Sequence, residues 1–357
     1  MVKAGGPGKD AAPAAGDDPH RHLSTLPGWR EFTALAPGQP GLLAAAEYAA
    51  LRDGARAAYD EERLDYHTRL GVVGTSVLRQ AVTTGRRLAL LNRHAVSARR
   101  GLILSGAAGT GKTTAITQLG KTHEATDRAR HPGQDRIPVI YVTVPPAATP
   151  RMLAMEFSRF LGLPALKRAN MTDVIEAVCG VAIDTRTSMV LVDEIHNMQL
   201  ATRNGAEVSD TLKYLSERIP ATFVYAGIDL ERQGLFTGIR GSQIAGRFTL
   251  IPALPFPLAG EWRGLLATLE DALRLHRHET GTLAGLDRYL HRRTRGMIGS
   301  LSHLSPPQPP TNCAWTQRPS RGRRGMVLGR APARPGPRAK RHRDGGGDER
   351  VSSPGAT

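Results

Sequence analysis

A run of glycines closed by a lysine and a threonine carries the clearest chemistry in this sequence. Residues 106–113 read GAAGTGKT and match the pattern G-x-x-x-x-G-K-S/T at every fixed position. Glycines let the backbone turn with its N–H groups pointing inward, where side chains would block a phosphate. The lysine would reach the outer phosphates of a nucleotide, and the threonine hydroxyl would face Mg²⁺. The residues assigned to this phosphate-binding loop are Gly106, Ala107, Ala108, Gly109, Thr110, Gly111, Lys112, Thr113 and Thr114.

An acidic pair supplies the second half of the predicted site. Residues 189–198 read MVLVDEIHNM, so an apolar strand runs directly into Asp193 and Glu194. Asp193 at the carboxyl end of a strand is placed to hold Mg²⁺ through its water shell, beside the Thr113 hydroxyl, and Glu194 is placed to orient and deprotonate the attacking water. The pair alone is a weak signal, but Lys112 lies 81 positions upstream. Together the two motifs predict an ATPase with ATP and Mg²⁺ as its cofactors.

His196 makes the second motif read Asp-Glu-x-His, a pattern also found in one superfamily of helicases. Such a helicase needs two tandem nucleotide-binding cores, and residues 260–357 contain no second alternation of strands and helices. A single AAA+ domain therefore fits better. For His196 itself two interpretations stay open: a group beside the magnesium, or a residue that merely begins a helix.

The segments that must position these residues alternate between strand and helix. Between the predicted strands lie amphipathic helices, such as the one with Leu153 and Phe157 on a shared face. This alternation predicts an α/β fold, a P-loop AAA+ parallel sheet domain covered by helices, over residues 100–258. The five apolar strand candidates are residues 101–105, 139–144, 188–192, 221–226 and 248–253.

The flanking segments differ in composition. Residues 1–40 are rich in Gly, Ala and Pro and are expected to be disordered, and residues 41–99 form a helical extension. Residues 259–304 carry helical apolar stripes and predict a small, truncated helical lid. For residues 305–357 two readings stay open, a disordered basic tail or a shifted reading frame, because the helical pattern of GMIGSLSHL stops in mid-element.

An AAA+ site is completed by an arginine finger from a neighbouring subunit, so the chain is expected to form a homo-oligomer. The candidates lie in GIRGSQIAGRF, before the fifth strand. Arg247 is the first choice as the finger that acts in trans, and Arg240 is the second. A solvated surface arginine is the alternative for both.

Two positions that sense phosphate in such domains are less well defined. The fourth strand ends in Ala226-Gly227-Ile228-Asp229, without the usual Asn or Thr. Arg295 fits either a phosphate-sensing arginine of the lid or a basic patch with Arg292 and Arg293.

The overall charge favours a polyanionic partner. The chain has 48 Lys and Arg against 32 Asp and Glu, a net charge of +16, and eleven basic but only three acidic residues follow Ser305. Its two cysteines, Cys179 and Cys313, cannot build a disulfide framework. Without a signal peptide or a run of about 18 apolar residues, a cytoplasmic protein with no membrane partner is expected. His276 and His278 are read as a surface pair rather than a metal site.

Several segments, over roughly residues 70–304, resemble those of TniB/TnsC-type AAA+ ATPases. They include GLILSGAAGTGKTTAITQLGK, MVLVDEIHNM, SQIAGRFTLIPALPF and TRGMIGSLSHL. The resemblance implies an ATP-dependent regulator that assembles on duplex DNA and helps a partner transposase, an integrase-like protein, to select its target. It gives Lys112, Thr113, Asp193, Glu194 and Arg247 the roles stated above. Two alternatives are a signalling or scaffold ATPase that acts on a protein partner without DNA, and an inactive product of a decayed gene.

Overall fold

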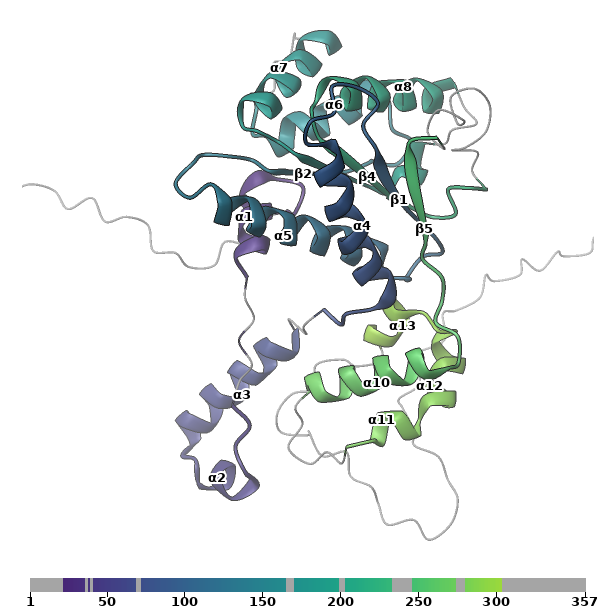
Figure 1. Cartoon of the computed structure of the whole chain (residues 1–357). Helices are drawn as coiled ribbons and strands as arrows, with labels where there is room; N and C mark the ends of the chain where they lie inside the picture. Colours follow the sequence, from purple (N-terminus) through teal and green to yellow (C-terminus); the bar gives the residue numbers. More distant parts are fainter. Residues whose placement is uncertain are drawn as a thin grey trace, which may run out of the picture. The chain divides into compact units, whose positions relative to one another are not determined.

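The computed structural model describes residues 22–35, 38, 41–68, 72–164, 170–198, 203–232, 246–273 and 280–303, and every structural statement below concerns these residues. They form a parallel β-sheet with helices packed on it, preceded and followed by smaller helical segments (Figure 1).

The sheet has five parallel strands in the order β2-β3-β4-β1-β5. Each strand begins and ends within one residue of its predicted bounds, which confirms the α/β fold class. The three inner strands β1, β3 and β4 are buried along their whole length, and the edge strand β2 is buried except at Thr143, as expected where helices cover both faces of a parallel sheet. The strands are β1 (Gly101–Ser105), β2 (Val139–Thr143), β3 (Met189–Asp193), β4 (Thr222–Gly227) and β5 (Phe248–Pro252).

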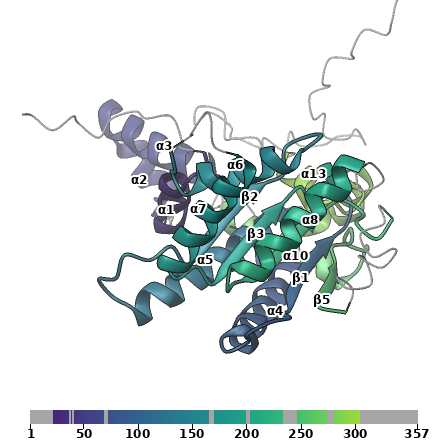
Figure 2. The same cartoon turned by 90° about the horizontal axis from the view of Figure 1, so that it is seen from above.

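Helices cover the sheet from two sides. Figures 1 and 2 show α4 (Ser76–Asn92) and α5 (Lys112–Arg130) on one face, and the other three on the opposite face. Local sequence explains where these helices begin: the Thr149 side chain accepts a hydrogen bond from the Met152 N–H, and a proline follows it. The three helices of the second face are α6 (Pro150–Phe160), α7 (Met171–Asp184) and α8 (Arg203–Arg218).

One helix lies where the sequence predicts disorder. Residues 26–34 form α1 (Leu26–Ala34), capped by the Thr25 side chain. Its Trp29 is completely buried, donates its indole N–H to the carboxylate of Glu124 on α5, and stacks on the Tyr141 ring. Burial of one large aromatic side chain outweighs the low-complexity composition around it. The prediction of disorder is therefore wrong for residues 26–34.

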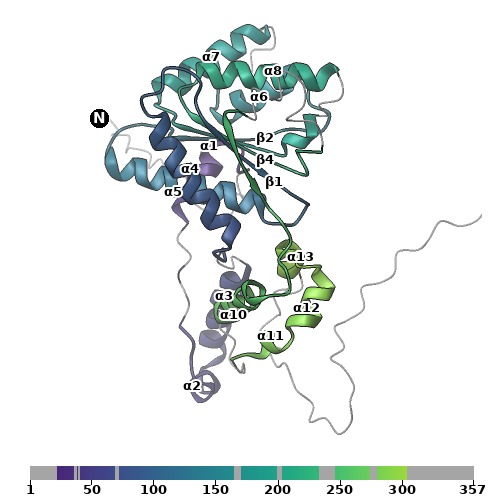
Figure 3. The same ribbon diagram turned by 45° about the vertical axis from the view of Figure 1, so that its right-hand side comes forward.

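The remaining helices flank the sheet domain. α2 (Ala45–Ala50) and α3 (Asp53–Thr68) precede it, and the Tyr66 hydroxyl on α3 donates to the Ala272 carbonyl at 2.7 Å. Figure 3 shows the helices of the lid, and a second, smaller apolar core that includes Phe256, Trp262 and Leu266 holds them together. The lid helices are α10 (Gly260–Leu273), α11 (Thr282–Gly285), α12 (Asp287–Thr294) and α13 (Ile298–His303).

Three expectations fall outside the described residues: the second finger candidate Arg240, the histidine pair His276 and His278, and the tail at 305–357. Among the helices that are described, none combines the length and the apolarity needed to span a membrane.

Candidate nucleotide-binding site

The phosphate-binding loop connects the end of β1 to the start of α5, as the motif predicts. Gly109 and Gly111 have φ angles of 78° and 88°, a left-handed backbone that favours glycine. Gly106 is required for a different reason: a Cβ atom there would lie 2.0 Å from the Ala253 carbonyl oxygen. Thus two of the three glycines shape the loop, and the first lets the backbone that follows β5 approach it closely.

Lys112 begins α5, and its side chain is buried inside the loop. Its Nζ donates to the carbonyl oxygens of Gly106 and Ala107, both at 2.8 Å. Burial lowers the pKa of Lys112, and the negative charges of Glu194, Asp193 and Asp229 oppose that shift. The lysine and the acidic pair therefore share one electrostatic environment, although they come from separate segments of the chain.

Asp193 ends β3 and is buried, with 2% of its surface exposed. One carboxylate oxygen accepts a hydrogen bond from the Glu194 backbone N–H at 2.8 Å, and the other from the Tyr141 hydroxyl at 3.1 Å. Burial, followed by the charge of Asp193, raises the pKa of Tyr141 well above its ordinary value, so the phenol is a neutral donor. The sequence analysis did not identify Tyr141.

Glu194 has an unusual backbone and a specific partner. Its φ angle is 56°, a left-handed conformation that is uncommon for non-glycine residues and that concentrates at functional sites. Its carboxylate lies 3.2 Å from His196 Nε2. The Ile228 N–H donates to His196 Nδ1 at 3.4 Å, so the imidazole proton is on Nε2 and faces Glu194. His196 also lies in the first turn of a short 3-10 helix, Ile195–Met198, so its place at a helix start is confirmed, and a role beside the magnesium stays a prediction that its contact with Glu194 supports.

The segment after β4 reaches the site through its backbone. The sequence offers no Asn or Thr at the end of this strand, and it is the Ile228 N–H that contacts His196. Next to it, Ser105 at the end of β1 donates its hydroxyl to the Glu231 carboxylate and accepts from the Leu230 N–H at 2.9 Å. These hydrogen bonds tie the ends of β1 and β4 together beside the loop.

The lid touches the phosphate-binding loop through two glycines. The Gly299 N–H on α13 donates to the Gly109 carbonyl at 2.8 Å. A Cβ atom on Gly299 would lie 3.0 Å from the Gly109 Cα, so only glycine allows this approach without a shift of the loop. Arg295, the candidate phosphate sensor, is exposed and has a φ angle of 53° at the end of α12. The sequence analysis did not identify Gly299, because a single glycine in a helical pattern carries no chemical signal.

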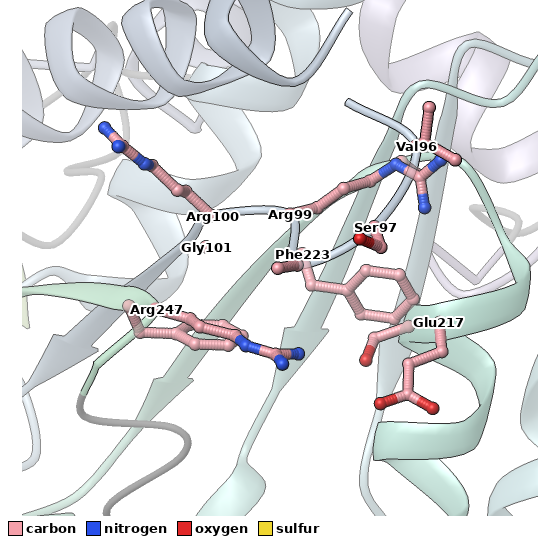
Figure 4. Close-up of a pocket in the computed structure, with 12 residues that line it drawn as sticks. Val96, Ser97, Arg99, Arg100, Gly101, Glu217, Phe223 and Arg247 are labelled. Carbon is pink, nitrogen blue, oxygen red and sulfur yellow. The ribbon is translucent and has the colours of Figure 1, made fainter. Parts of the chain in front are cut away.

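Arg247 lies at the amino-terminal end of the strands, and the phosphate-binding loop lies at their carboxyl-terminal end. Arg247 directly precedes β5, and its carbonyl accepts a hydrogen bond from Gly101, the first residue of β1, whereas the phosphate-binding loop follows the last residue of that strand. Arg247, Arg99, Phe223 and Glu217 help to line a pocket of about 290 Å³ there. Figure 4 shows Arg247 extending towards the side of the pocket that carries Glu217. Arg247 is therefore not part of the site built around Lys112.

The residues at the loop fit a magnesium nucleotide. The left-handed glycines form a turn without side chains, Lys112 provides a cation within it, and Asp193 and the exposed Thr113 provide the hard oxygen ligands that Mg²⁺ prefers. In proteins Mg²⁺ is commonly held by one or two carboxylates and by phosphates of the substrate. In the described part of the chain, no group of three or more His, Cys, Asp or Glu side chains is arranged to hold a metal ion.

Comparison with protein families identifies one match. The family model of the bacterial TniB protein matches residues 74–256, which is more than half of the chain. This range includes all five strands, the phosphate-binding loop, the acidic pair and Arg247. A search of curated proteins gave no match.

Solved structures with a similar fold include two of the Aeropyrum pernix ORC2 protein. The ADP form has 19% sequence identity and a TM-score of 0.49, and the match covers 67% of this chain and 64% of that one. Its ADPNP-ADP complexes have 16% sequence identity and a TM-score of 0.46, and the match covers 62% of this chain and 60% of that one. The Aeropyrum pernix ORC1 protein in complex with DNA has 17% sequence identity and a TM-score of 0.43, and the match covers 66% of this chain and 67% of that one. The chain thus spans less than two thirds of the ORC2 protein, and the ligands in these structures are properties of those proteins.

Proposed function

The chain belongs to the TniB family of bacterial proteins, and on this basis we propose that it is an ATP-binding and hydrolysing AAA+ regulator that assembles on duplex DNA and assists a transposase in target-site selection. The family places it among the AAA+ ATPases. We propose further that it acts on DNA in transposition, with an integrase-like transposase as its partner. It would form a homo-oligomer and be located in the cytoplasm.

The arrangement of Lys112, Asp193 and Glu194 is the observation that carries the proposal. Both carboxylates act on the charge of Lys112, although the lysine begins a helix, Asp193 ends a strand and Glu194 directly follows that strand. A buried cation inside a loop of left-handed glycines, in the electrostatic field of two carboxylates that follow a parallel strand, supports binding of a phosphate chain together with a divalent cation.

Each residue then has a role in hydrolysis. Lys112 pairs with phosphate oxygens, and Thr113 with Asp193 would hold Mg²⁺, which when bound neutralises charge on the phosphates. Glu194 orients a water molecule and accepts its proton, since its carboxylate is half-exposed while its backbone is held beside Asp193. His196, whose Nε2 proton faces that carboxylate, orients Glu194.

ATP hydrolysis with and without duplex DNA tests the proposal. The wild type is expected to hydrolyse ATP faster with DNA. Glu194→Gln is expected to lose activity by about 10²- to 10⁴-fold, because it removes the general base, and to keep its nucleotide affinity. Glu261→Gln, at an exposed position on α10, is the matched control that keeps full activity. DNA binding measured in parallel should weaken steeply as salt rises, because contacts to phosphates release counterions.

The outcomes separate the alternatives. Hydrolysis that depends on Glu194 but ignores DNA would favour the signalling or scaffold ATPase, whose partner is a protein. Equal hydrolysis by the wild type and Glu194→Gln would contradict the assigned site. A folded wild type that hydrolyses nothing would favour the decayed gene product.

A further inference from the structure

We infer that Tyr141 is a positioning residue for Asp193 and thereby sets how tightly the site holds Mg²⁺ together with a nucleotide. The inference rests on the proposed function, because it assumes that Asp193 faces a magnesium ion. It concerns a residue on β2, outside both sequence motifs.

The sheet register brings the two side chains together. β2 and β3 pair in parallel, with Thr143 opposite Asp193 and Tyr141 opposite Leu191. Side chains two positions apart on a strand point to the same face, so Tyr141 and Asp193 share a face of the sheet. The Tyr141 hydroxyl donates to one Asp193 carboxylate oxygen at 3.1 Å, in a buried environment.

The Tyr141 ring is itself held in place. It is 4% exposed, and it stacks on Trp29 with ring centroids 5.8 Å apart and an angle of 11° between the planes. Trp29 is completely buried and donates to Glu124, which forms an ion pair with Arg128 on the same helix. The hydroxyl that meets Asp193 is therefore carried by a rigid side chain braced by α1.

The hydrogen bonds at Asp193 leave lone pairs on its carboxylate for a metal. An ionised carboxylate has about four lone-pair sites. Among the described residues, the Tyr141 hydroxyl takes one on the first oxygen and the Glu194 N–H takes one on the second, so each oxygen keeps a lone pair. A partner that orients a ligating carboxylate in this way typically contributes a factor of about 10 to 100 in metal affinity. Loss of the Tyr141 hydroxyl should therefore weaken Mg²⁺ binding and leave the phosphate-binding loop unchanged.

Tyr141→Phe tests this, with Tyr225→Phe as the matched control. Tyr225 is also 4% exposed and lies on β4, opposite Val192, so it points to the other face of the sheet. Binding of a fluorescent ATP analogue to the full-length protein is measured in EDTA and across a Mg²⁺ titration, and the melting temperature is recorded for each variant. Neither readout requires hydrolysis.

Tyr141→Phe is expected to bind the analogue in EDTA as the wild type does, but to need about tenfold more Mg²⁺ for half of the magnesium-dependent gain in affinity. Tyr225→Phe is expected to match the wild type throughout. The same Mg²⁺ requirement in both variants would overturn the inference, and so would weaker binding of Tyr141→Phe in EDTA. A wild type that does not bind the analogue, or binds it without any effect of Mg²⁺, would instead contradict the proposed function.

Discussion

The side chain of Lys112 links the two halves of the site. Its ammonium group donates to two carbonyls of its own loop, and its charge interacts with three carboxylates beyond that loop. A cation held in this way is ready to exchange the carbonyls for the more negative oxygens of a phosphate, because charge-assisted hydrogen bonds to an anion are the stronger ones.

Replacement of this lysine should therefore weaken nucleotide binding. Lys112→Ala removes charge-assisted hydrogen bonds worth about 1.5–3 kcal/mol, so we expect nucleotide affinity to fall by about 10- to 100-fold. Equilibrium binding of a fluorescent ATP analogue measures the change. Lys213→Ala, an exposed lysine on α8, is the control and should bind normally. Unchanged affinity in Lys112→Ala would show that the loop does not bind the phosphates.

At the scale of elements, glycines decide how closely helices and strands approach each other. Gly120 lies in the middle of α5, where glycine is unfavourable by about 0.5–1 kcal/mol relative to alanine. A Cβ atom there would lie 2.6 Å from Leu191 Cδ1 and 2.7 Å from Trp29 Cη2. Gly120 therefore lets α5 pack against β3 and α1 at once.

Gly120→Ala is expected to destabilise the protein by about 1–3 kcal/mol, because a methyl group overpacks a core that contains the rigid Trp29 ring. Chemical denaturation measures the free energy of unfolding. Gly180→Ala on α7 is the matched control, since a Cβ atom there meets nothing within 4 Å. The control should be stabilised by about 0.5–1 kcal/mol. Equal effects of the two substitutions would rule out the close approach at Gly120.

At the scale of the whole molecule, Arg247 and the phosphate-binding loop lie at opposite ends of the same pair of strands. β1 and β5 have five residues each, and such a strand spans about 16 Å. An arginine at this distance from its own loop suits a finger that acts on the nucleotide of a neighbouring subunit, as the sequence analysis predicts. Its role in trans stays a prediction.

Mixing two inactive variants tests that role. Arg247→Ala is expected to lower ATP hydrolysis by about 10³-fold, as loss of an arginine finger does. An equimolar mixture with Glu194→Gln should regain activity, because some sites then combine Glu194 from one subunit with Arg247 from the next. The Arg247→Ala, Glu194→Gln double variant mixed with Glu194→Gln should regain none. No recovery in the first mixture, with both proteins folded, would place Arg247 outside the neighbour's site.

The parts of this protein that depend on local pattern could be predicted from its amino-acid sequence. The glycine spacing of the phosphate-binding loop, the acidic pair at 193–194 and the five strands could be predicted because each is encoded within a few consecutive residues. Continuous apolar runs indicate strands buried on both faces, whatever lies elsewhere in the chain. The fold class and the centre of the site followed from these segments alone.

The residues from distant parts of the chain that contact the site are known from the fold alone. Three such contacts join residues far apart in sequence. Trp29 stacks on Tyr141, Tyr141 donates a hydrogen bond to Asp193, and Gly299 donates one to Gly109. Composition predicted disorder around Trp29, Tyr141 lies outside the motifs, and the segment that contains Gly299 does not show that this glycine meets Gly109. Packing and strand register, rather than periodicity, bring such pairs together, so a local pattern cannot encode them.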